Sequence, residues 1–97
     1  MGIWSRLDSV SAISFPNMRF NHFLSSYFPD TRYGGARLFD DMLEQARVAD
    51  HLGYHAVSIP EHHLINILLT PAPLQMAVRV AAETEGVDIV TAVAVLP

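Results

Sequence analysis

The sequence predicts an α/β fold in which three parallel strands alternate with two helices, in the order β-α-β-α-β. Two segments, 36–52 and 72–85, carry apolar residues at the three- and four-residue spacing of amphipathic helices. Short runs rich in β-branched and aromatic residues lie at 19–25, 54–59 and 87–96. These runs begin about 33 to 35 residues apart, which is the length of one right-handed strand-helix-strand crossover. Neighbouring strands are therefore expected to be parallel.

The first predicted strand alternates apolar and polar side chains, with Phe20 followed by Asn21 and His22. A loop of eleven residues, SSYFPDTRYGG, comes after it. Pro29 and two glycines punctuate this loop, and it is longer than the usual connection between two elements. We therefore expect the loop to have a functional role.

The helix predicted at 36–52 has a clear apolar stripe. Residues three or four positions apart form it: Phe39, Met42, Leu43, Ala46, Ala49 and Leu52. Gly53 comes directly after, where the residue that ends a helix takes the left-handed conformation that glycine adopts without strain. The helix is therefore expected to end there and to lead straight into the second strand.

The second half of the chain continues the alternation. The strand YHAVSI precedes a helix for which Thr70 is the predicted N-cap, while Pro71 and Pro73 fit its first turn and Gly86 follows its end. The last stretch, VDIVTAVAVLP, is almost unbroken in apolar residues. Such a run is typical of a strand covered on both faces within a parallel sheet.

Composition limits the chain of 97 residues to one small domain and excludes several functions. All six basic residues are arginine and the formal net charge is −4, so no basic patch is available for nucleic acid. Cysteine is absent, which excludes disulfides and thiolate metal sites and fits a reducing, cytoplasmic compartment. The sequence contains no uninterrupted apolar stretch of about 18 residues, the length that a membrane span needs, so no span is predicted. Residues 1–17 lack the apolar core of a secretory signal and are interpreted as a loose N-terminal extension.

Two architectures repeat this strand-helix unit: an open doubly wound sheet and the eight-fold (β/α)8 barrel of the TIM type. The Gly-x-Gly-x-x-Gly motif of the dinucleotide-binding open sheet is missing, so the barrel is favoured. Residues 18–97 are then interpreted as the N-terminal portion of such a barrel, truncated after its third strand. Its uncovered apolar interior and free sheet edges would favour association, so we expect a homo-oligomer.

In both architectures the working face lies at the carboxyl ends of the strands, and Glu61, His62 and His63 follow the second strand there. Histidine titrates near neutrality, so beside a carboxylate it can accept a proton, donate one or hold a negative oxygen. Adjacent residues of an extended chain point to opposite sides. Only one of the two histidines is therefore expected to face the pocket directly.

Other interpretations of these polar residues stay open. From spacing alone, a Glu-His-His triplet at a strand end is more often a solvated turn than a catalytic group. A zinc site has less support, because a metalloprotease helix places two histidines four residues apart around a glutamate, and this sequence has neither that spacing nor cysteine. We therefore predict no metal site. His22, on the first strand, is interpreted either as a core histidine or as a functional neighbour of the triplet.

The residues LFDDMLEQARVADHLGYHAVSIPEHHLINILLTPAPLQMAVRVAAETEGVDIVTAVAVLP resemble the N-terminal part of the bacterial luciferase-like, flavin-dependent monooxygenases, and the resemblance covers 18–97. The step from Gly53 and Tyr54 into a strand ending in E-H-H carries most of it, and the final T-A-x-A-V-L-P adds to it. The resemblance implies a barrel that binds reduced FMN, reacts it with O₂ and uses the product on an aldehyde or another small organic substrate. Whether a deazaflavin replaces FMN, and which flavin reductase serves as partner, stay open.

The resemblance also assigns roles by position. The first histidine of the family's E-H-H is the acid/base or intermediate-stabilising group, which makes His62 the first catalytic candidate. His63 is the second candidate, and Glu61 stands beside both. We expect loss of His62 to lower turnover more than it lowers flavin affinity.

The same resemblance points to cofactor contacts. A non-proline cis peptide often lies in the family's third strand under the flavin ring, and the matching step here is Ala92-Val93. Short side chains suit that place because a flat ring stacks closely on exposed backbone, although close barrel packing explains Ala92 and Ala94 equally well. Asn21 and Phe23 lie on the strand that faces the flavin or substrate in the family.

In the family, the segments that bind the phosphate come from later strands, so the chain ending at Pro97 is expected to be inactive alone. Two rival functions remain. One is a non-catalytic α/β module that works by self-association. The other is a different TIM-barrel enzyme, such as a metal-dependent hydrolase.

Overall fold

The structure, a computed structural model, describes residues 18–96, and these form three strands, two α-helices and one short 3₁₀ helix. In chain order the elements are β1 (Asn21–Phe23), the 3₁₀ helix η1 (Thr31–Tyr33), α2 (Gly35–His51), β2 (Ala56–Ile59), α3 (Pro73–Glu83) and β3 (Asp88–Thr91). The predicted order of strands and helices is confirmed. The predicted N-terminal extension lies outside the described residues.

The three strands form one parallel sheet in the order β1-β2-β3. Asn21 pairs with Ala56, and Ala56 pairs with Asp88, so one register runs across the whole sheet. The prediction of adjacent parallel strands is confirmed. Each paired segment is only three or four residues long. The strands are shorter than predicted because the flanking residues leave the ladder to enter the connecting loops.

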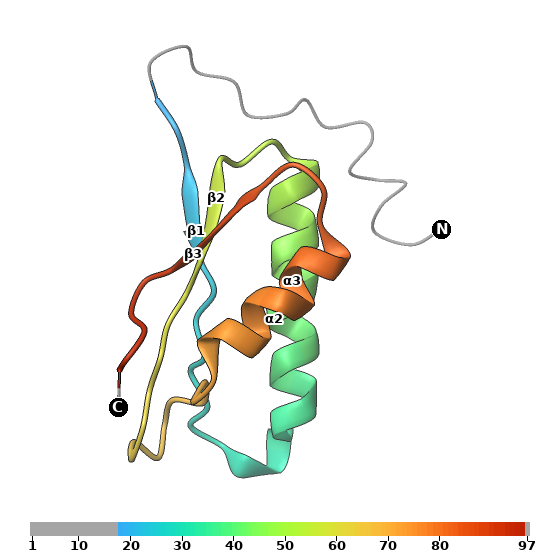
Figure 1. Ribbon diagram of the computed structural model, residues 1–97. Helices are drawn as coiled ribbons and strands as arrows, with labels where there is room; N and C mark the ends of the chain where they lie inside the picture. The colour runs from blue at the N-terminus through green and yellow to red at the C-terminus, as the bar shows by residue number, and fades with distance from the viewer. Residues whose placement is uncertain (1–17, 97) are drawn as a thin grey trace.

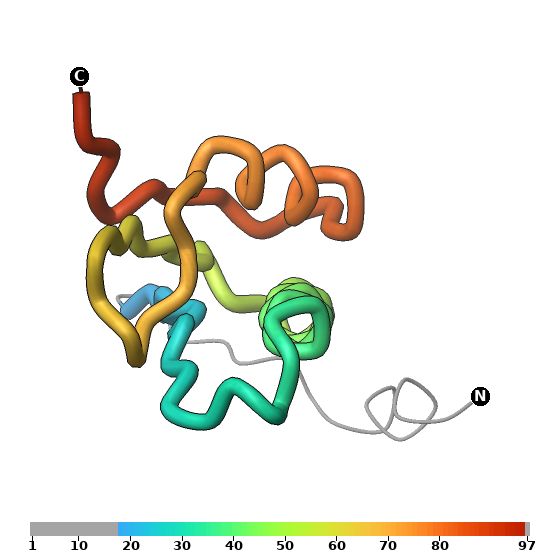
Figure 2. The backbone as a smooth tube through the Cα atoms, turned by 90° about the horizontal axis from the view of Figure 1, so that it is seen from below, coloured from blue at the N-terminus to red at the C-terminus, as the bar shows by residue number. Residues whose placement is uncertain are grey.

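Both helices lie on the same side of the sheet, as the ribbon and the view from below show (Figure 1, Figure 2). Gly53, just after α2, has a φ of 83°, which confirms the predicted end of that helix. Side chains of both helices pack on the central strand and form one core with Leu24 and Val87: Leu38, Met42, Leu43, Ala46, Ala49, Val57, Ile59, Met76 and Val80. Of the stripe read from the sequence, Met42, Leu43, Ala46 and Ala49 are buried, whereas Phe39 and Leu52 are only partly buried.

Neighbouring residues of β2 point to opposite sides of the sheet. Val57 and Ile59 point toward the helices and are fully buried. Residues of the other parity form the side of the sheet turned away from both helices, which we call the open face: Asn21, Phe23, Ala56, Ser58, Asp88 and Val90. Phe23 and Val90 are 50% and 41% exposed there. The sheet thus has one packed side and one side that offers apolar surface.

The loops that follow β1 and β2 pair with each other at the carboxyl ends of the strands. The N–H of Phe28 donates to the carbonyl of Ile67 at 2.7 Å, and the N–H of Leu69 donates to the carbonyl of Ser26 at 2.9 Å. This antiparallel pairing joins the two loops into one layer. The long loop predicted after β1 therefore forms part of the carboxyl end of the sheet, where the E-H-H triplet lies.

Thr70 is not the N-cap of α3, so that prediction is wrong. The helix begins at Pro73, and Ala72 occupies the N-cap position. Thr70 is buried, its carbonyl accepts the N–H of His62 at 2.9 Å, and its hydroxyl donates to the carbonyl of Leu69. The bridge to His62 holds Thr70 within the loop, before the helix can start.

One carboxylate of α2 fixes the chain at the opposite end of the sheet. Asp50 accepts the backbone N–H groups of three successive residues, Glu85, Gly86 and Val87, each at 2.9 Å. These residues connect α3 to β3. Asp50 therefore fixes the point at which β3 enters the sheet.

Candidate functional site

The segments that leave β2 and β3 lie side by side at the carboxyl end of the sheet. The N–H of Ala92 donates to the carbonyl of Ile59 at 2.9 Å, and the N–H of Val95 donates to Oε2 of Glu61 at 2.6 Å. Glu61 also borders a hollow of about 280 Å³ between the start of α3 and residues 94–96. The E-H-H triplet and the Ala92-Val93 step are thus brought to one place.

Glu61 and His63 form a close pair. Nε2 of His63 lies 2.6 Å from Oε1 of Glu61, and the glutamate side chain is only 8% exposed, against 48% for the imidazole. The hydrogen bond with His63, and after it the bond from the N–H of Val95, hold the pKa of Glu61 below its ordinary value. Glu61 is therefore an ionised carboxylate at neutral pH with both oxygens engaged.

His62 stands apart from this pair. Its backbone N–H donates to the carbonyl of Thr70, and the residue is partly buried. Glu61 and His63 meet on one side of the chain, as residues two apart in an extended segment do, and this alternation gives His62 the opposite parity. Of the predicted catalytic trio, the structure joins Glu61 to His63 and leaves His62 separate.

The predicted cofactor contacts on β1 belong to the open face. Oδ1 of Asn21 accepts a hydrogen bond of 2.9 Å from Oγ of Ser58 on β2, and half of Phe23 is exposed beside them. The sequence reasoning did not select Ser58. The alternation within YHAVSI could have identified it, because Ser58 lies between two apolar residues that both face the helices.

Ala92 and Val93 follow β3, which ends at Thr91, and both are exposed. No cis peptide bond occurs within residues 18–96, so the Ala92-Val93 peptide is trans. A non-proline cis bond is costly and persists only where surrounding structure enforces it. Here the segment is fixed through the backbone N–H groups of Ala92 and Val95.

His22 is a structural partner of α2. Its Nε2 lies 2.9 Å from Oε1 of Gln45, and its ring meets the ring of Tyr54 edge-on, with the centroids 6.2 Å apart. These contacts lie on the side of the sheet that carries the helices. The structure therefore supports the structural interpretation of His22 and separates it from the triplet.

No group of three or more His, Cys, Asp or Glu side chains within 18–96 is arranged to hold a metal ion. In the same part of the chain, neither helix combines the length and the apolar character needed to cross a membrane.

Comparisons with known proteins agree with this fold. Residues 18–97 match the family of luciferase-like monooxygenases. The chain is 31% identical over 80 residues to the oxygenase component of the flavin-dependent trigonelline monooxygenase of Acinetobacter baylyi, a match that covers 82% of this chain and 22% of the relative. The crystal structure of apo-MsnO8 is similar with a TM-score of 0.66 and 30% identity, over 73% of this chain and 21% of that chain.

The chain thus spans about a fifth of the length of each of these two relatives. The similarity covers the segment in which the parallel β-α-β-α-β unit, the E-H-H triplet and the T-A-x-A-V-L-P end were found. Fold, triplet and family match therefore point to one conclusion, that of a TIM-barrel portion. The chain belongs to the luciferase-like monooxygenase family.

Proposed function

We propose that this chain provides the first strands of a flavin-dependent monooxygenase that uses reduced FMN and O₂ to oxygenate an aldehyde or another small organic molecule. The observation that carries the proposal is the open face of the sheet, which leads directly to the E-H-H triplet. In parallel α/β folds this end of the sheet is where ligands bind and chemistry takes place.

The open face suits a flat, largely apolar ring. Its central strand contributes Ala56 and Ser58, which are short and buried between their neighbours, so the ring would lie over them rather than between large side chains. Phe23 and Val90 flank them with exposed apolar surface, while Ser58 and Asn21 add hydrogen-bonding groups. When bound, the flavin would supply the reducing electrons and the reaction with O₂. The residues around it would orient the ring and exclude water.

We assign the movement of a proton to His62. Oxygen transfer requires a proton to be accepted or returned close to the reacting atoms, and a neutral imidazole can do both near pH 7. The parity of His62 is opposite to that of the Glu61-His63 pair, which is already engaged with the segment after β3. His63 is the second candidate for the same role.

The partners follow from the proposed reaction. The relative from Acinetobacter baylyi is named as an oxygenase component, which supports a separate reductase that delivers reduced flavin. FMN is the proposed cofactor and a deazaflavin is its alternative. Titration of the protein with each compound, followed by fluorescence, distinguishes the two.

A chimeric barrel tests the proposal. Residues 18–97 replace the matching segment of the trigonelline monooxygenase component, and flavin binding and substrate-dependent O₂ consumption are measured. Ala92→Phe puts a bulky ring at the proposed flavin contact and is expected to raise the flavin Kd about 5- to 150-fold, since overpacking a contact costs about 1 to 3 kcal/mol. Ala81→Phe, at an exposed position of α3, is the matched control. Equal effects of the two substitutions contradict the proposal.

A homo-oligomer is proposed for the chain in isolation. The half-exposed Phe23 and Val90 lie on a face that turns away from both helices, and the outer edges of β1 and β3 border that face. An ordinary interface covers roughly 800 Å² per partner, so a second copy would have to cover the exposed Val93, Val95 and Leu96 as well as this face. Sedimentation should give a concentration-dependent mass that Phe23→Ser reduces, and a monomer at high concentration excludes the idea.

A further inference from the structure

We infer that Glu61 is a positioning residue, whose carboxylate holds the backbone N–H of Val95 and so fixes the segment 92–95 beside β2. The consequence for catalysis rests on the proposed function, because Ala92 and Val93 are the proposed flavin contacts of that segment. The tether itself is a property of the chain without any ligand and can be measured separately.

The tether begins where the sheet ends. The last paired residues of β2 and β3 are Ile59 and Thr91, and the N–H of Ala92 makes one further bond, to the carbonyl of Ile59. Three residues later the N–H of Val95 finds its acceptor in the side chain of Glu61, at 2.6 Å. A carboxylate thus takes the place of a backbone carbonyl and extends the contact between the two strands.

Glu61 is itself held firmly enough to serve as an anchor. Pro60, with its fixed φ, is buried before it, and the N–H of His62 is bonded to Thr70 after it. His63 occupies the second carboxylate oxygen. The backbone on both sides of Glu61 and both of its oxygens are therefore fixed.

This arrangement is unfavourable for a role of Glu61 as acid or base. Both oxygens already accept short hydrogen bonds, and the side chain is almost completely buried. The lowered pKa adds to this, because a carboxylate that resists protonation is a weak base near neutrality. Holding the N–H of Val95 requires an acceptor oxygen fixed in place, which the ionised carboxylate of Glu61 provides.

The test uses the 97-residue chain, with amide hydrogen exchange measured by NMR. Glu61→Ala removes the acceptor, and the exchange of the Val95 amide is expected to accelerate by at least about tenfold, as for loss of a bond to a charged group. Glu61→Gln keeps an oxygen at the same length, so protection of Val95 should stay within a few-fold of the original chain. The amide of Ala92, bonded to Ile59, is the internal control and should change little in either variant.

His63→Ala separates the two contacts of the carboxylate. It removes the bond at Oε1 and leaves Oε2, so Val95 is expected to remain protected. If Glu61→Ala fails to fold, Glu61→Leu fills the same space without an acceptor and takes its place. The inference is wrong if Val95 exchanges as before without the carboxylate, if Ala92 loses as much protection as Val95, or if Glu61→Gln loses as much as Glu61→Ala.

The same variants in the chimeric barrel measure the functional consequence. Glu61→Ala should raise the flavin Kd by about tenfold or more, and Glu61→Gln should restore most of the affinity. If Glu61 were instead an acid or a base, both variants would lose that group equally, and turnover would fall rather than flavin affinity. Failure of the chimera to bind flavin would count against the proposed function and would leave the Val95 result unchanged.

Discussion

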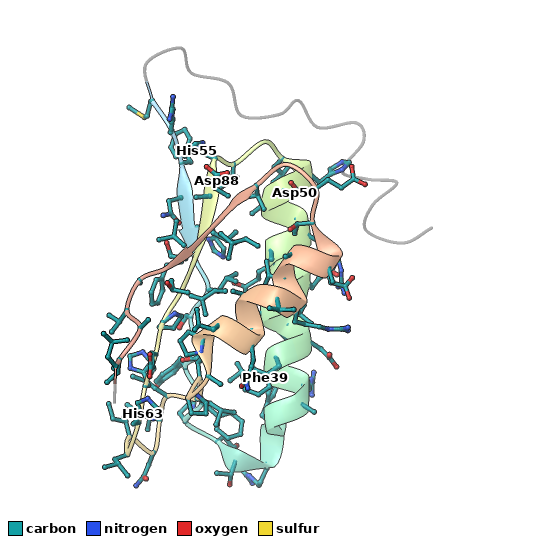
Figure 3. The ribbon with its side chains drawn as sticks, in the orientation of Figure 1. Phe39, Asp50, His55, His63 and Asp88 are labelled. Atoms are coloured by element: carbon teal, nitrogen blue, oxygen red, sulfur yellow. The ribbon has the colours of Figure 1, made fainter. Side chains whose placement is uncertain are left out.

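Two histidine-carboxylate pairs lie at opposite ends of the sheet, and they differ in burial and closeness (Figure 3). At the amino end, Nε2 of His55 is 3.5 Å from Oδ2 of Asp88, and these side chains are 44% and 69% exposed. At the carboxyl end, His63 and Glu61 approach to 2.6 Å, and Glu61 is 8% exposed. The same two types of group therefore form a loose solvated pair in one place and a tight pair in the other.

The difference fits the roles proposed for the two ends of the sheet. An exposed pair at 3.5 Å contributes little, because water screens both charges. At the amino end the chain relies instead on Asp50, which accepts three backbone N–H groups and has a purely structural role. At the carboxyl end, the carboxylate of Glu61 holds the segment 92–95 beside the proposed cofactor site. Stability at one end and function at the other is the usual division in parallel barrels.

The largest effect expected from this comparison is on turnover, and it belongs to the carboxyl end. His62→Ala in the chimeric barrel should lower oxygenation by about 10² to 10⁴, the usual worth of acid/base assistance, with the flavin Kd within a few-fold. His63→Ala should lower turnover less, because that imidazole is engaged with Glu61. Stopped-flow turnover and flavin titration of both variants check the assignment. Greater damage from His63→Ala, or loss of flavin binding in His62→Ala, would reverse it.

At the amino end the largest effect is on stability. Asp50→Ala leaves three N–H groups of the α3-β3 connection without their acceptor and should lower the free energy of unfolding by about 2 kcal/mol. Urea unfolding followed by circular dichroism measures the change. Asp40→Ala is the matched control, since Asp40 is an exposed residue of the same helix, and its effect should stay within about 0.5 kcal/mol. Equal losses in the two variants would show that the three bonds contribute nothing specific.

The sequence predicted the elements well because their signals are local. Each of these signals spans only a few neighbouring residues: the apolar stripe of α2, Gly53 at its end, and the apolar run of each strand. The contacts of Asp50 and Glu61 could not be found in this way, because their backbone partners are more than 30 residues away and carry no side-chain signature. Thr70 failed as a cap for a different reason, since its carbonyl accepts the N–H of His62 within the same loop and holds it there.

The response to acid should also separate the two ends. The pKa of Glu61 is held below its ordinary value of 4.5, so its ionised form stabilises the folded chain. That contribution is fully present above pH 4.5 and is lost as the pH falls through the lower pKa of the folded state. Glu61→Gln should therefore melt below the parent chain near neutrality, and the gap in Tm should close on acidification below pH 4.5. A gap that widens in acid contradicts the argument.

The smallest effect is expected at His55. Its side chain lies 3.5 Å from the exposed carboxylate of Asp88. Its backbone N–H donates to the carbonyl of Phe20, and its carbonyl accepts the N–H of Asp88. His55→Ala removes the imidazole and keeps these backbone bonds, so unfolding should change by no more than about 0.5 kcal/mol. Urea unfolding at low and at high salt is the measurement, because screening should abolish whatever small difference exists. A loss above about 1 kcal/mol that survives high salt would show that the amino-end pair is structural, and the contrast with Glu61 and His63 would then disappear.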